Sequence, residues 1–105
     1  MQLYRDVARA AFVRQPIGDD EYIHVFGEID TETDADFRQT IAEAARSAKR
    51  VVIDFSRCTY VGSQGFGVLF DAKKLTDLAV IAPARIRRLM GIVGLSSLLI
   101  GPHTD

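Results

Sequence analysis

One serine stands where this sequence could perform chemistry: Ser63, in the stretch Tyr60-Val61-Gly62-Ser63-Gln64-Gly65-Phe66-Gly67. The stretch is a small polar turn between an apolar strand and an apolar helix, so Ser63 is expected at the helix start. There the helix dipole and the free backbone N–H groups favour an anion such as phosphate. A hydroxyl that can be phosphorylated at such a point can act as a switch. Serine is also among the best helix N-caps, where it contributes about 1 kcal/mol, so a purely structural role for Ser63 stays open.

The glycines around Ser63 do not form a nucleotide-binding loop. No Gly-Lys-Ser/Thr follows Gly62 at the spacing of a phosphate-binding loop, and Gly62, Gly65 and Gly67 lack the order of the dinucleotide fingerprint. Glu28 and Asp30 could form an acid/base pair or bind a metal. Since no histidine or third carboxylate completes such a site at a fixed spacing, a solvated turn that leads into a helix is the better interpretation.

The other reactive side chains are isolated in the sequence. Asp54 lies inside an apolar strand and needs hydrogen-bond partners, for which backbone N–H groups near the strand end are expected. Cys58 is expected as a small buried residue rather than a nucleophile. His24 and His103 lie far apart and form no visible Ser-His-Asp arrangement. A basic cluster on a later helix is interpreted as a solvated face: Arg85, Arg87 and Arg88. The sequence therefore predicts a protein that is not an enzyme and binds no metal or cofactor.

Alternating strands and helices must position these residues. Val51-Val52-Ile53-Asp54-Phe55 is nearly unbroken in apolar character, which is typical of a central parallel strand covered on both faces. The expected elements are a hairpin of Val7–Val13 and Tyr22–Phe26, a helix after an N-cap at Thr33, the strand Val51–Phe55, a helix Gln64–Leu75, a strand Leu78–Ala82, a short helix that starts at Pro83 with Ile86, Leu89 and Met90 inward, and a last strand Leu98–Ile100. The order β-β-α-β-α-β-α-β predicts a single α/β domain over residues 1–105, whose mixed sheet has parallel core strands packed by helices.

The composition argues against nucleic acid and membranes as partners. Thirteen basic and fourteen acidic residues give a net charge of −1, which offers no electrostatic basis for binding nucleic acid or an anionic membrane. One cysteine excludes an intramolecular disulfide. The sequence shows no signal peptide and no apolar run of the roughly 20 residues that a membrane span needs. A cytoplasmic protein without membrane insertion, monomeric or weakly dimeric, is expected.

Three segments together resemble the STAS family, the domain of anti-sigma factor antagonists and of sulfate transporter tails. Gly27-Glu28-Ile29-Asp30 resembles the family's Gly-Glu-Leu-Asp turn, and Val51-Val52-Ile53-Asp54-Phe55-Ser56 resembles its central strand. Val61-Gly62-Ser63-Gln64-Gly65-Phe66-Gly67-Val68-Leu69 is similar to its Asp-Ser-Ser-Gly-Leu-Gly-Val-Leu switch. The stretch from Ile81 to Leu95 follows the family's late strand and helix. The resemblance covers most of the chain in the right order and spacing.

The resemblance implies a role for each matching residue. Ser63 falls on the family's phosphoacceptor serine, and Asp30 on the acidic residue near the switch. The partner-binding face would comprise Asp30, Gly62, Ser63, Gln64, Gly65 and Phe66. The implied partner is an ATP-dependent serine kinase that doubles as an anti-sigma factor, with a phosphatase that resets the switch. Gly62 departs from the family, much of which has an aspartate before the serine.

The favoured hypothesis is partner switching: the chain binds the anti-sigma kinase while Ser63 is unphosphorylated and is released on phosphorylation. The alternative is an accessory subunit of a membrane transporter ATPase, in which the same loop is a permanent docking surface and Ser63 only a helix cap. A nucleotide-binding or hydrolysing enzyme is the third option, disfavoured because no phosphate loop, metal constellation or triad is present in the sequence.

Overall fold

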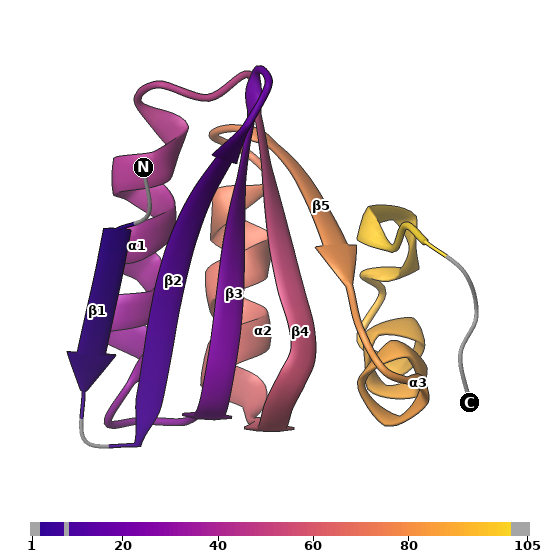
Figure 1. Ribbon diagram of the computed structural model, residues 1–105. Helices are drawn as coiled ribbons and strands as arrows, with labels where there is room; N and C mark the ends of the chain where they lie inside the picture. Colours follow the sequence, from indigo (N-terminus) through magenta and orange to yellow (C-terminus); the bar gives the residue numbers. More distant parts are fainter. Residues whose placement is uncertain (1–2, 8, 102–105) are drawn as a thin grey trace.

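Five strands form one mixed sheet in the computed structural model, which describes residues 3–7 and 9–101 (Figure 1). In both chain order and spatial order they are β1 (Leu3–Val7), β2 (Ala10–Ile17), β3 (Asp20–Ile29), β4 (Arg50–Val61) and β5 (Asp77–Ile81). β1, β2 and β3 pair in antiparallel fashion, whereas β3, β4 and β5 pair in parallel. The predicted α/β fold with parallel core strands in a mixed sheet is therefore confirmed.

Two helices cover one face of this sheet. α1 (Asp34–Ala45) and α2 (Ser63–Ala72) lie side by side behind the strands, while α3 (Ala84–Ile92) and the 3-10 helix η1 (Ser96–Leu98) lie beyond β5 (Figure 1). Three fully buried rings join the sheet to α1: the Phe12 and Phe37 centroids are 5.8 Å apart, and those of Phe37 and Phe55 are 6.0 Å apart. Such aromatic contacts add to the area that each ring buries. The predicted N-cap of α1 at Thr33 is confirmed.

The two ends of the sheet differ from the sequence prediction. The prediction missed β1, because Leu3–Val7 shows no regular apolar alternation and forms an edge strand paired with β2. The predicted last strand Leu98–Ile100 is wrong. After Gly94 turns the chain with a φ of +83°, the segment forms η1, and a single bridge joins Leu99 to Val80. The predicted helix start at Pro83 is also wrong, since Pro83 is the N-cap of α3.

β4 runs well past Phe55 and stays paired with β3 through two irregularities. The pairing shifts between His24 and Phe26 and again between Gly27 and Glu28, as in β-bulges. Gly27 has a φ of +88°, and a Cβ there would clash with the backbone oxygen of Arg9. Only glycine fits this position. β3 continues through Gly27 to Ile29, whereas the predicted strand ended at Phe26.

The two parallel strands end together. Ile29 at the end of β3 lies opposite Val61 at the end of β4, and the backbone N–H of Gly62 donates to the Ile29 carbonyl oxygen at 2.9 Å. The turn that contains Asp30 and the start of α2 therefore meet at the same edge of the sheet.

Candidate functional site

Ser63 is the first residue of α2, and its side chain is exposed. The N-cap is Gly62, which has extended backbone (φ −87°, ψ 180°) and whose carbonyl oxygen accepts hydrogen bonds from the N–H groups of Gly65 and Phe66 at 3.0 and 3.3 Å. No side-chain hydrogen bond caps α2, and the Ser63 hydroxyl lies 3.5 Å from Oε1 of Gln64. A helix begins at this turn, as predicted, but α2 spans Ser63–Ala72 rather than Gln64–Leu75. The N-cap interpretation of Ser63 is wrong, because α2 begins one residue earlier than expected.

The space where a side chain at position 62 would begin is covered by two neighbours. A Cβ on Gly62 would lie 3.2 Å from Oε1 of Gln64, 3.2 Å from the hydroxyl oxygen of Tyr60 and 3.3 Å from its Cε2. The extended backbone of Gly62 suits any residue, so the position does not require glycine for conformational reasons. A neutral ring and a neutral amide thus lie against position 62, next to Ser63.

Gly65 and Phe66 face inward and offer little surface to a partner. A Cβ on Gly65 would lie 2.7 Å from Cγ2 of Ile29 and 2.7 Å from Cγ1 of Val61, so glycine lets α2 approach the strand ends. Phe66 is 6% exposed and belongs to the hydrophobic core. Both residues position Ser63 and Gln64, which are the exposed residues of this turn.

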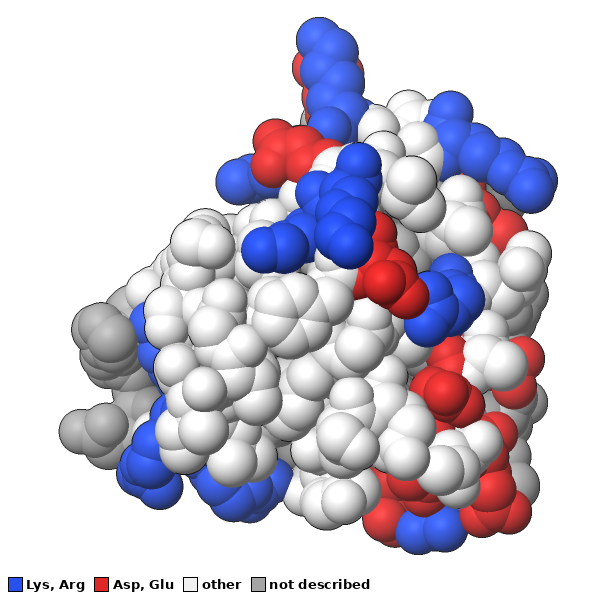
Figure 2. Space-filling model, turned by 180° about the vertical axis from the view of Figure 1, so that it is seen from behind, with Lys and Arg blue, Asp and Glu red and all other residues white. Residues whose placement is uncertain are grey.

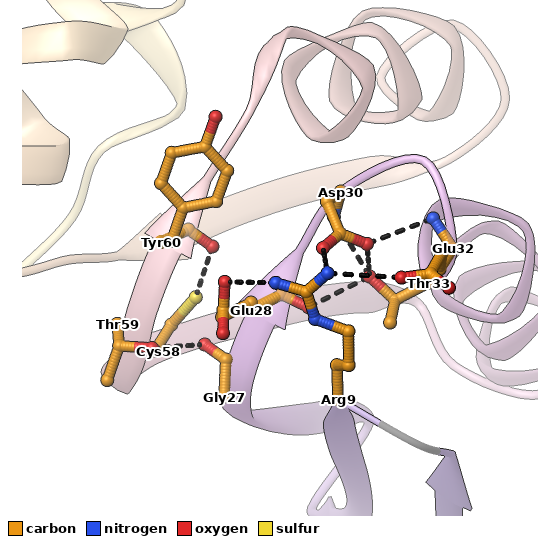
Figure 3. A network of polar contacts seen from close by, with 9 residues as sticks. All are labelled: Arg9, Gly27, Glu28, Asp30, Glu32, Thr33, Cys58, Thr59 and Tyr60. Atoms are coloured by element: carbon orange, nitrogen blue, oxygen red, sulfur yellow. Dashed lines mark hydrogen bonds and ion pairs between the residues drawn. The ribbon is translucent and has the colours of Figure 1, made fainter.

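Asp30 is held by its own turn (Figure 3). One carboxylate oxygen lies 3.0 Å from Nη1 of Arg9, and the other accepts the backbone N–H of Glu32 at 2.9 Å. Arg9 also pairs with Glu28 at 2.8 Å and with Glu32 at 3.0 Å (Figure 3). The Asp30 side chain is 16% exposed. It lies at the same edge of the sheet as Ser63, and its carboxylate stabilises the turn and holds Arg9.

An apolar groove begins at Ser63 and runs between α2 and α3. It has a volume of about 500 Å³ and is lined by Tyr60, Val61, Gly62, Ser63, Phe66, Gly67, Phe70, Leu89 and Val93. Tyr60 is 51%, Leu89 38% and Val93 37% exposed, so large apolar side chains face solvent here. Figure 2 shows a broad uncharged area over α2 and α3, with acidic groups gathered at the lower right. Contiguous exposed apolar surface of this kind is typical of a protein-binding site.

A second polar group lies on the sheet face opposite α1 and α2. Nδ1 of His24 is 2.8 Å from Oδ2 of Asp54, and Nε2 is 2.8 Å from Oε1 of Gln15. The hydroxyl and the backbone N–H of Ser56 donate to Oδ1 of Asp54 at 2.6 and 2.9 Å. Burial raises the pKa of Asp54, but the hydrogen bonds from Ser56 and His24 outweigh it, so that the pKa lies below its usual value. Both ring nitrogens of His24 are engaged, and the Ser56 hydroxyl serves Asp54, so the group lacks the serine–histidine contact of nucleophilic catalysis.

The remaining candidates from the sequence are Cys58, a metal site and His103. Cys58 is 5% exposed, as predicted for a small buried residue; burial raises the pKa of its thiol, which donates to the Tyr60 carbonyl oxygen at 3.3 Å. In residues 3–7 and 9–101, no three His, Cys, Asp or Glu side chains are grouped so that they could hold a metal ion. His103 lies outside the described residues. Within that same part of the chain, no helix has both the length and the apolar character to cross a membrane.

Sequence reasoning missed the apolar side of the site. Leu89 was predicted to point inward with Ile86 and Met90, but it lies on the groove, because α3 packs beyond β5 and leaves this flank beside α2 uncovered. Phe70 of α2 is half-buried on the groove. Their apolar type is the same as that of core residues, so only the tertiary arrangement distinguishes them.

Comparison with known proteins gives one family and several similar folds. The family model described as "Mlab, STAS domain" matches residues 15–100. An anti-sigma factor antagonist from Mycobacterium paratuberculosis is similar in structure, with a TM-score of 0.82 and 24% sequence identity over 89% of this chain and 86% of that chain. The anti-sigma factor antagonist SpoIIAA in its unphosphorylated form gives a TM-score of 0.73 and 18% identity over 85% of each chain. The Bacillus cell fate determinant SpoIIAA in its phosphorylated form gives a TM-score of 0.62 and 18% identity over 95% of this chain and 89% of that chain. Among curated proteins, none matches the sequence significantly.

Proposed function

The chain belongs to the STAS domain family, and from this membership we propose that it is an anti-sigma factor antagonist that works by partner switching. It binds an anti-sigma serine kinase while Ser63 is unphosphorylated and is released when Ser63 is phosphorylated. The kinase supplies ATP, magnesium and the catalytic base, and a phosphatase removes the phosphate. Two of the proteins with a similar fold are described as anti-sigma factor antagonists, which supports this role.

The observation that carries the proposal is the position of the Ser63 hydroxyl. It is exposed at the first position of α2, takes no part in capping, and lies on the rim of an apolar groove. A kinase can therefore reach it without unfolding the helix. The first N–H groups of a helix have no partner within the helix, and they favour an anion. The free protein can thus accept a phosphate at this point.

Phosphorylation would act through charge in the contact. It adds about −1.5 to −2 charges at pH 7, which water and the helix N–H groups can solvate in the free protein. Arg9, a cation at the same edge, is already engaged by Glu28, Asp30 and Glu32. In a closed interface the phosphate loses its water, and a penalty of about 3 kcal/mol would weaken binding more than a hundredfold. That change is enough to reverse a competition between two partners, with no change of fold.

The test is the affinity of Ser63 variants for a partner purified from the native host with the Ser63→Ala protein as bait. We expect Ser63→Ala to bind as the unphosphorylated parent does and Ser63→Asp to bind more weakly, both measured by isothermal titration calorimetry. Ser97→Asp, at an exposed serine in η1, is the matched control and should not weaken binding. If Ser63→Asp and Ser63→Ala bind the partner equally well, the partner-switching proposal is wrong.

A second candidate function is permanent docking to a membrane transporter ATPase. The residue before Ser63 favours permanent docking. It is Gly62, covered by the neutral side chains of Tyr60 and Gln64, where the family's switch typically has a carboxylate. In that case the groove would bind its partner in all conditions. The intact mass of the protein from its native host distinguishes the two: a population heavier by one phosphate supports switching, whereas its absence in every growth condition, with a transporter ATPase bound, supports permanent docking.

A further inference from the structure

The groove between α2 and α3 has the arrangement of side chains expected of a site that binds a third helix. Phe66 and Phe70 of α2 are four residues apart, as are Leu89 of α3 and Val93, the C-cap residue of α3, and all four line the groove. Residues four apart form a row along one side of a helix. Two such rows with an apolar floor between them receive the ridge of another helix, whose anchors repeat at three- and four-residue spacing.

Two cations, Arg85 and Lys73, lie beside residues of the groove. α3 (Ala84–Ile92) also carries Arg87 and Arg88 and has no Asp or Glu in its sequence, and Arg87 donates to the Ile100 carbonyl oxygen at 3.4 Å. The guanidinium of Arg85 donates to the Thr59 carbonyl oxygen at 2.7 Å, which is a neutral group, so its charge is left for an acidic partner. On the other side, Nζ of Lys73 lies 5.4 Å from the centre of the Phe70 ring. Figure 2 shows Lys and Arg groups above and below the uncharged area.

We infer that the groove receives an amphipathic helix of the partner protein, with an apolar ridge and acidic residues on its flanks. This inference rests on the proposed function, since it names the part of the partner that binds beside Ser63. The ridge contacts Phe70, Leu89 and Val93, and the flanking carboxylates face the cations of α3 and Lys73. A second copy of this chain is a poorer occupant, because its α3 carries arginines and no Asp or Glu that could pair with Arg85 and Lys73.

An acidic helix also gives the phosphate on Ser63 a direct effect. Ser63 lines the groove at the start of α2. A phosphate there would repel carboxylates of the bound helix and would compete with them for the same cations. Release would then follow from the charge of the partner segment as well as from the loss of hydration.

The test is photo-crosslinking in the native host with the full chain. A benzoylphenylalanine is placed at Ile92, which is 75% exposed on α3, and separately at Leu75, which is 85% exposed beyond the end of α2 and borders a different cavity, between α1 and α2. The crosslinked peptides are then sequenced by mass spectrometry. We expect Ile92 to capture a segment with apolar residues at i, i+3 or i+4, and i+7 and a net negative charge, and Leu75 not to capture that segment.

Charge reversal provides the second arm. The double variant Arg85→Glu, Arg88→Glu should lower the crosslink yield from Ile92 about tenfold, because two exposed attractions become repulsions. Arg46→Glu, at an exposed arginine at the end of α1, is the control and should leave the yield unchanged. A basic or non-helical captured segment, capture of a second copy of this chain, or an unchanged yield in the double variant would overturn the inference.

These outcomes are separable from a failure of the proposed function. If Ile92 captures an acidic helix and the yield is the same with Ser63→Asp, the groove inference stands and partner switching fails. If the Ser63→Asp protein loses its partner but the captured segment is basic, partner switching stands and the groove inference fails.

Discussion

Gly65 sets how closely the start of α2 approaches the ends of β3 and β4, and its replacement by alanine tests this packing. The new Cβ would lie 2.7 Å from Cγ2 of Ile29 and 2.7 Å from Cγ1 of Val61. Ile29 is 0% and Val61 4% exposed, so neither side chain can move into solvent. Ordinary contact begins at 3.4 Å, so the start of α2 must move outward by 3.4 − 2.7 Å, or about 0.7 Å.

The expected cost follows from two opposing effects. Overpacking of a well-packed site costs about 1–3 kcal/mol, whereas alanine in place of glycine inside a helix contributes roughly 0.5–1 kcal/mol. We therefore expect Gly65→Ala to lower the free energy of unfolding by about 1–2 kcal/mol. Gly67→Ala is the matched control in the same helix, because nothing lies within 4 Å of its Cβ. It should raise the free energy of unfolding by about 0.5–1 kcal/mol.

Urea unfolding followed by circular dichroism measures both variants. With a urea slope of about 1–3 kcal/mol/M, the midpoint of Gly65→Ala should fall below that of the parent and the midpoint of Gly67→Ala should rise above it, with slopes unchanged. Equal midpoints for the two variants would refute the close approach of α2 to the strand ends, and with it our explanation of how Ser63 is positioned.

Three further predictions concern single side chains. Ser63→Ala should change the free energy of unfolding by less than about 0.5 kcal/mol, because the hydroxyl caps no backbone N–H; a loss near 1 kcal/mol in urea unfolding would restore the capping role. Leu89→Glu should weaken partner binding at least about tenfold, a loss of roughly 1.4 kcal/mol, because it puts a charge on the groove. Leu75→Glu is its control, and equal affinities of the two variants in calorimetry would argue against the groove. The lowered pKa of Asp54 predicts stabilisation that is complete above the unfolded value, roughly pH 4, and is lost as the pH falls through the folded value. Asp54→Asn should flatten this loss in urea unfolding between pH 7 and pH 2, whereas an unchanged pH dependence would show that the contacts to His24 and Ser56 contribute nothing.

Local patterns in the sequence predict the parts of the site that depend on local structure. The nearly unbroken apolar run Val51–Phe55 predicts the central parallel strand, and the polar turn after it predicts that a helix begins beside Ser63. Ser63 is the N-cap if the helix begins at Gln64, and Gly62 is the N-cap if it begins at Ser63. Serine and glycine are both accepted caps. Propensity alone does not decide between them.

Contacts that depend on strand register could not be predicted in this way. His24 meets Asp54 because β3 and β4 are neighbours in parallel register at that point. Arg9 reaches Asp30 across the bulge at Gly27. Leu89 has the spacing of a core residue, and it is exposed because α3 packs beyond β5 and leaves this flank uncovered. Each of these facts requires the relative placement of elements that are distant in the sequence.

In the proposed mechanism, a phosphate on Ser63 controls partner binding at the groove. The most direct test compares the dissociation constants of unphosphorylated protein and of protein with phosphoserine at position 63 alone, each titrated with the same purified partner. We expect the phosphorylated protein to bind more than about a hundredfold more weakly, which corresponds to roughly 3 kcal/mol. Dissociation constants that agree within about twofold would contradict it.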